Sequence, residues 1–209
     1  MTNEISENNI MHVLNWTYDK ATNGILGFDS AEEMANDYLK GNGSLVYRAN
    51  SLIRMQNTKA ASSGFLSGLG GVILMPVTIP ANISSVMYIQ VRMIAAIATM
   101  GGYNIRDDKV KSLVFSCLVG DAAKDVLKDT GIIIGTKIAT NSVKNMSSKT
   151  IIAINKKIGF RLVTKFGEKG AINLGKAIPI IGGLIGGTMD LVTTNIIGNI
   201  SRDTFIGVN

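Results

Sequence analysis

The sequence is poor in the residues that most often build disulfides and metal sites. Among its 209 residues there is one cysteine, Cys117, and one histidine, His12. A single cysteine excludes an internal disulfide framework and favours a reducing compartment. His and Cys ligation is equally limited, so we expect no metal and no other cofactor. We interpret His12, which has acidic neighbours on an expected surface helix, as incidental rather than catalytic.

Charged residues are also scarce, at 17% of the chain against roughly a quarter in ordinary soluble domains. None lies between Lys59 and Arg92. A gap of that length indicates either a deeply buried core or a surface that faces lipid. The first residues, MTNEISENN, are polar and acidic and lack the apolar segment of a signal peptide. We therefore expect a cytoplasmic protein.

The charge that is present is distributed unevenly. Residues 1–58 contain seven acidic and four basic residues, whereas residues 131–189 contain nine basic residues and one acidic residue. A basic segment beside apolar surface suits an anionic membrane, where each Lys or Arg contributes about 1 kcal/mol. It also suits a solvated helix face or, less favourably, nucleic acid. The anionic-surface candidates are Lys149, Lys156, Lys157, Arg161, Lys165 and Lys169.

Apolar periodicity predicts helices almost throughout and no convincing series of strands. We expect an all-α fold, a single-domain helical bundle. Its predicted centre is an apolar helix at about 81–100, preceded by a Gly/Pro-broken apolar element at about 64–80. Residues 1–58 are expected to form an acidic helical segment packed on or appended to the domain made by residues 59–209.

Start and stop signals locate the individual helices. Ser30 and Glu33 form a capping-box pattern that opens a short helix. Asp107 is the expected cap of a helix that continues past Gly120 to about Lys128. The remaining predicted helices span about 7–22, 45–56, 131–145, 148–166 and 180–204.

The predicted 81–100 helix is apolar on every side, which places it either in the centre of a bundle or in a bilayer. Arg92 near its middle disfavours a simple membrane span, because a charge at the bilayer centre costs at least about 2.5 kcal/mol. We therefore predict that the helix is buried in protein, where Arg92 needs a carboxylate partner. Asp190, isolated in a second apolar stretch, is the first candidate for this internal ion pair, and Asp121 is the second.

Small residues recur every four positions, as at Gly64 and Gly68, a spacing that lets helix backbones approach closely. Because Pro76 and Pro80 interrupt the apolar run, residues 64–80 are predicted to form a re-entrant or hairpin-like element. We expect this element to touch the membrane. The membrane-contact candidates are Phe65, Leu66, Leu69, Val72, Ile73, Leu74, Met75 and Val77.

The sequence contains no recognisable catalytic constellation, and we predict that the protein is not an enzyme. Asp121, Asp125 and Asp129 stand at i, i+4 and i+8, a spacing that stacks three carboxylates on one helix face. Lys124 and Lys128 are placed to neutralise them. We therefore prefer a solvated ion-pair face to an oxygen-ligand cation site.

Several motifs occur together in a recognisable order. They are a Gly-rich apolar stretch ending in Met75-Pro76, the Pro80 step, Gln90-x-Arg92, the Leu118–Asp121 turn with Lys124, and Gly175-Lys176-x-x-Pro179-x-x-Gly182. In this order they resemble the bacterial EcsC protein family. The resemblance runs from about residue 60 to residue 200.

The resemblance implies an association with the membrane but no particular reaction. The family is named for a protein encoded beside an ABC-type exporter and is regarded as membrane-associated, and no catalytic residues carry over. It implies a peripheral membrane protein, with anionic lipids or a membrane protein as partner and an accessory or interaction role. Two alternatives stay open: a soluble interaction protein or homo-oligomer with the apolar stretch fully buried, and, less favoured, a hydrolase in which Asp121 and Asp125 converge.

Overall fold

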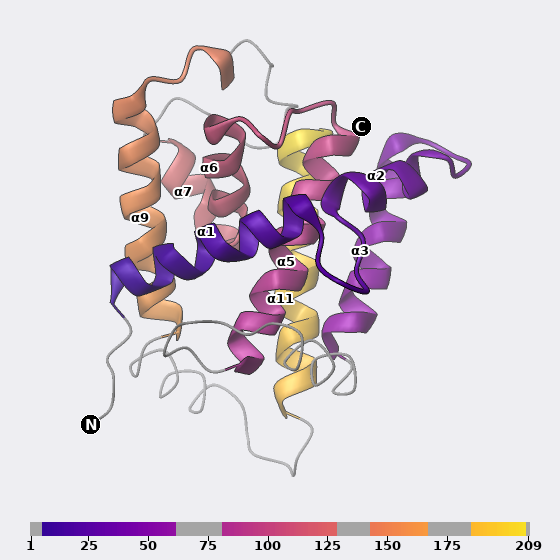
Figure 1. The fold of residues 1–209 in the computed structure, drawn as a ribbon, viewed down its shortest axis with the longest axis horizontal. Coiled ribbons are helices and arrows are strands. Elements are labelled where there is room, and N and C mark those ends of the chain that lie inside the picture. The colour runs from indigo at the N-terminus through magenta and orange to yellow at the C-terminus, as the bar shows by residue number, and fades with distance from the viewer. Residues whose placement is uncertain (1–5, 62–80, 129–142, 167–184, 208–209) are drawn as a thin grey trace.

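The computed structural model describes residues 6–61, 81–128, 143–166 and 185–207. Within these ranges the regular structure consists of eight α-helices and one 3₁₀ turn (Figure 1), so the predicted all-α single domain is confirmed. The helices are α1 (Glu7–Asn23), α2 (Ala31–Leu39), α3 (Leu45–Ala61), α5 (Ala81–Met100), α6 (Asp108–Cys117), α7 (Ala123–Lys128), α9 (Ser148–Phe166) and α11 (Ile185–Phe205), with the 3₁₀ turn η1 at Gly120–Ala122.

α5 is the centre of the bundle. It packs against α1, α2, α3, α6 and α11, and every described side chain from Ser84 to Ala98 is buried. The prediction of a buried central helix is therefore confirmed. In Figure 1, α1 crosses the nearly parallel α5 and α11, while α9 and α3 lie at opposite ends of the long axis.

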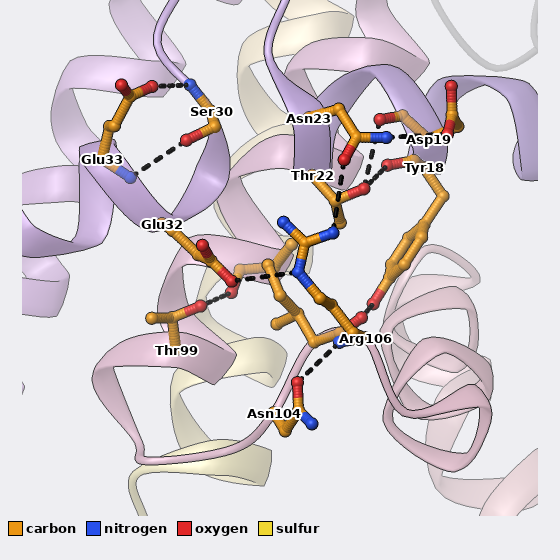
Figure 2. Close-up of polar contacts among 12 residues, drawn as sticks. Tyr18, Asp19, Thr22, Asn23, Ser30, Glu32, Glu33, Thr99, Asn104 and Arg106 are labelled. Carbon is orange, nitrogen blue, oxygen red and sulfur yellow. Dashed lines mark hydrogen bonds and ion pairs between the residues drawn. The ribbon is translucent and has the colours of Figure 1, made fainter.

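Capping residues explain where the first two helices begin. Ser6 Oγ accepts a hydrogen bond from the Asn9 N–H at 3.2 Å, and α1 ends at Asn23, before the C-cap residue Gly24 with its positive φ of 79°. α2 opens with the predicted capping box (Figure 2), in which Ser30 Oγ accepts from the Glu33 N–H at 3.2 Å and Glu33 Oε2 accepts from the Ser30 N–H at 2.8 Å. The helix starts are thus determined locally.

Polar contacts join α1 and α2 to the loop that follows α5 (Figure 2). Tyr18 Oη donates to the Ile105 carbonyl oxygen at 2.6 Å. Arg106 Nη1 donates to Asn23 Oδ1 at 3.3 Å, and Arg106 Nε lies 3.8 Å from Glu32 Oε1. The acidic N-terminal helices therefore pack on the core, and their buried apolar residues belong to the same hydrophobic cluster as those of α5.

One predicted helix boundary is wrong. α6 opens as expected, with Asp107 Oδ1 accepting from the Lys109 N–H at 2.9 Å, but it ends at Cys117 rather than continuing to Lys128. Gly120 has a φ of 64°, a left-handed conformation that an α-helix does not accommodate. The chain continues as η1 and α7 instead.

α11 packs against α3 and α5 and brings residues far apart in sequence into contact. Gly198 of α11 lies against Ile53 of α3, with no space for a side chain between them. Near the end of α11, Arg202 Nη1 donates to Asn50 Oδ1 on α3 at 2.6 Å. The last and third helices of the described chain are therefore direct neighbours.

Some of the other predicted helices are confirmed, and the rest lie outside the described residues. Those at 7–22, 45–56 and 148–166 are confirmed as α1, α3 and α9, and the helix expected at 180–204 is confirmed from Ile185 onward. Most of the helix expected at 131–145, and the whole 64–80 element, lie outside the described residues.

Candidate functional site

α9 has one buried face and one exposed face. Ser147 caps its start, with Oγ accepting from the Thr150 N–H at 3.1 Å. Ile154, Ile158 and Leu162 are buried, and the helix packs on α1, α6 and α7. The spacing of four residues places these side chains in one stripe, so the opposite side of α9 is open to solvent.

The exposed face of α9 combines large apolar side chains with cations. Ile152 is 67% exposed and Phe160 is 61% exposed. With Lys156 between them they follow each other at intervals of four residues, and so they lie along one strip of the helix. Lys149 and Arg161 are also exposed on α9. We call these five residues the α9 outer face.

A groove of about 670 Å³ borders the α9 outer face. It is formed by α9 together with α1 and α7. Its lining residues are Glu7, Asp125, Val126, Ala153, Lys156, Lys157, Phe160 and Arg161. Because three cations and two carboxylates line the groove, its charge is predominantly positive.

The structure places five of the predicted anionic-surface residues on α9, and it describes the side chains of four of them, Lys149, Lys156, Lys157 and Arg161. Lys157 is half-buried, and the other three are exposed. The Lys165 side chain and Lys169 lie outside the described residues. All eight membrane-contact candidates, in the 64–80 element, also lie outside them.

The apolar members of the α9 outer face were not predicted as a site. Sequence reasoning assigned function in this segment to the cations alone. A signal was present, because Ile152 and Phe160 are eight residues apart on the helix side opposite Ile154 and Ile158. Exposed apolar residues indicate a contact surface when they gather on one face rather than stand singly, and Ile152 and Phe160 share one strip of α9.

Arg92 is the second feature, and it is only 2% exposed. Its Nη1 donates to the Asp29 main-chain oxygen at 3.1 Å. Its guanidinium carbon lies 5.8 Å from the Phe28 ring centre and 5.4 Å from that of Tyr88, within cation–π range. Burial lowers the pKa of the Arg92 guanidinium, while Tyr88 and Asp29 raise it.

The predicted ion pairs of Arg92 have different outcomes. Pairing with Asp121 is wrong, because η1 places Asp121 at the surface while Arg92 is buried on the central helix. The Asp190 side chain lies outside the described residues, so the Arg92–Asp190 pair stays a prediction. What the structure adds is the Asp29 carbonyl and two aromatic rings as contacts of the guanidinium.

The other residues weighed as chemical groups are separated. Asp121 and Asp125 are both exposed, but only Asp125 lines the α9 groove, and Asp129 lies outside the described residues. Within the described ranges no group of three His, Cys, Asp or Glu residues is arranged to hold a metal ion. His12 is exposed, whereas Cys117 is buried, which raises the pKa of its thiol to about 11.

No helix in the described ranges is long and apolar enough to cross a membrane. Comparison with curated proteins and with solved structures found no match. A model of the EcsC protein family matches residues 7–206, which extends the resemblance seen in the sequence to the N-terminal helices. Because the match covers nearly the whole chain, this protein belongs to the EcsC protein family.

Proposed function

We propose that this protein binds the surface of an anionic membrane from the cytoplasmic side, through the α9 outer face. It acts there as a non-catalytic accessory or interaction protein for a membrane partner such as an exporter. One observation carries the proposal: two large apolar side chains, Ile152 and Phe160, are exposed on the same helix as three exposed cations.

Apolar contact and charge support membrane binding together. Each Lys or Arg near an anionic surface contributes about 1 kcal/mol, and full burial of a Phe or Ile side chain contributes about 1.5–3 kcal/mol. Peripheral binding that depends on both is expected to weaken at high salt, because salt screens the charged part. Nucleic acid is a less suitable partner, because its phosphate backbone provides no apolar surface against which Ile152 could be buried.

Flotation with lipid vesicles tests this proposal. The wild-type protein should float with vesicles containing anionic lipid at low salt, and less with neutral vesicles or at high salt. Lys156→Gln with Arg161→Gln removes two charges and should weaken binding about 30-fold. Phe160→Ser should weaken it about 10-fold or more.

A matched control comes from the other end of the molecule. Arg54 is exposed and Met55 is 49% exposed on α3, so Arg54→Gln with Met55→Ser removes a cation and an apolar side chain without touching α9. This control should float like the wild type. Equal recovery with neutral and anionic vesicles at low salt would overturn the electrostatic part of the proposal.

The alternative is a soluble interaction protein or homo-oligomer. The burial of α5 supports it, because that part of the long uncharged stretch is covered by the protein itself. This alternative predicts no flotation with any vesicle. As a homo-oligomer, the protein would use the α9 outer face as the contact between its copies. Phe160→Ser should then lower the mass measured by light scattering.

A further inference from the structure

The α9 groove carries charges of both signs, and the two signs come from different helices. Its exposed cations, Lys156 and Arg161, are on α9. Its two carboxylates are also exposed, with Glu7 at the start of α1 and Asp125 in the first turn of α7. The third cation, Lys157, is half-buried. The exposed charge of the groove is therefore balanced, with two positive groups and two negative ones.

These exposed charges do not pair with each other. Among the described residues, neither Lys156 nor Arg161 forms a hydrogen bond or an ion pair with either carboxylate. The start of α1 is nevertheless close to α9, as Figure 1 shows, because a Cβ added to Gly159 would lie 3.7 Å from the Cβ of Glu7. A ligand in the groove can therefore meet groups of both signs at once.

Exposed apolar side chains complete the lining of the groove. Phe160 is 61% exposed, and Ala153, seven residues earlier on α9, is exposed as well. Because seven residues are close to two helical turns, both side chains lie on the same side of α9, about 10 Å apart along its axis. A ligand that fits this groove must therefore combine an apolar part with charged groups of both signs.

We propose that the α9 groove binds one phospholipid molecule whose headgroup carries a phosphate and a primary ammonium group, as in phosphatidylethanolamine. The inference rests on the membrane binding proposed above and names the lipid. The phosphate accepts hydrogen bonds from Lys156 and Arg161, whose guanidinium suits it. The ammonium group donates to Glu7 and Asp125, and an acyl chain lies along Phe160. The groove volume of about 670 Å³ is ordinary for a site that takes a small molecule, about 300–1,000 Å³.

NMR of the intact protein with monomeric lipid tests this inference without a membrane. The probe is dihexanoyl phosphatidylethanolamine below its critical micelle concentration, and the amide resonances of Ala153 and Phe160 should shift in a saturable manner. Phosphatidylcholine with the same chains should bind about 3–10-fold more weakly, because its trimethylammonium group donates no hydrogen bond. Phosphatidylglycerol with the same chains, which has no ammonium group, and glycerophosphoethanolamine, which has no chains, should also bind more weakly. Equal or tighter binding of any of the three would overturn the assignment.

A variant without the carboxylates separates the groove from the charged surface around it. Glu7→Gln with Asp125→Asn changes two exposed residues, so the protein should fold normally. It should bind the ethanolamine lipid about 10-fold more weakly and no longer prefer it to the glycerol lipid. In flotation, the same variant should bind anionic vesicles at least as well as the wild type, because its surface is more positive. A retained preference for the ethanolamine lipid would overturn the proposal.

Ile152→Ser is the matched control, because Ile152 belongs to the α9 outer face but does not line the groove. It should weaken flotation with vesicles and leave the binding of monomeric lipid unchanged, and a loss of monomer binding would count against the groove as the site. Flotation of the wild type without a saturable shift would overturn the lipid site and leave membrane binding in place. A saturable shift without flotation would overturn membrane binding and support the lipid site.

Discussion

The substitution Gly198→Ala, which adds a single carbon atom, tests how closely α11 packs on α3. A Cβ at this position would lie 2.7 Å from Ile53 Cγ2 and 2.8 Å from Ile53 Cγ1, whereas carbon atoms pack best at about 3.5–4.0 Å. Both neighbours are attached directly to Cβ of Ile53, so neither can swing away as the end of a long side chain can. Gly198→Ala must therefore separate the helices or force Ile53 out of its rotamer.

Two opposing terms determine the size of the effect. Alanine gains about 1 kcal/mol over glycine inside a helix, while overpacking a core costs about 1–3 kcal/mol. We expect overpacking to dominate and the free energy of unfolding to fall by about 1 kcal/mol, which lowers the Tm by about 2–4 °C in a chain of this size. In an Ile53→Ala background both γ carbons are absent, so there Gly198→Ala should stabilise by about 1 kcal/mol.

Urea denaturation of the four proteins of this cycle measures the change of sign as a coupling energy. Ile53→Val is the matched control, because it keeps both γ carbons and shortens the side chain only at its end. Gly198→Ala should therefore remain destabilising in that background. Stabilisation of the wild type by Gly198→Ala, or no coupling with Ile53→Ala, would refute the close packing of α11 on α3.

Two further predictions concern a cap and a thiol. Ser30→Ala removes half of the capping box and should lower the free energy of unfolding by about 1 kcal/mol in thermal denaturation, whereas the control Glu33→Gln keeps the reciprocal bond and should cost less. The Ser30 main-chain N–H, and then its hydroxyl, lower the pKa of the Glu33 carboxyl, so this contribution is present above the ordinary Glu pKa and is lost as the pH falls through the lowered value. An NMR titration midpoint at the ordinary Glu value would contradict this. Burial raises the pKa of Cys117 to about 11, so its thiol should react with iodoacetamide on the order of 100-fold more slowly in the native protein than in urea, and equal rates would contradict its burial.

Features determined by local chemistry were predictable from the sequence. The capping box of Ser30 and Glu33 places α2 correctly, because the hydrogen bonds concerned span only three residues. The buried centre of the bundle was equally predictable, since a helix that is apolar all round has no solvent-facing side. The cations of α9 were also predictable, because the excess of Lys and Arg in this segment can be counted directly in the sequence.

The rest depended on contacts between distant segments. Gly120 fits the apolar period of a continuing helix, and the sequence gives no sign of its left-handed φ at the place where η1 packs on α11. The Arg92 contact was missed because a main-chain carbonyl, that of Asp29, has no sequence signature, and it lies 63 positions away. Phe160 was not recognised as a surface residue because an apolar residue in a helix is normally assigned to the core.

The pairing of α3 with α11 also has a consequence for how the chain folds during synthesis. Arg202 and Asn50 are separated by 152 positions, so α3 leaves the ribosome long before its neighbour exists. Until α11 is made, the side of α3 that carries Ile53 stays uncovered, and exposed apolar surface of this kind makes a nascent chain prone to aggregation. The bundle therefore closes late, and a stop codon before α11 should yield an insoluble product rather than a smaller folded one.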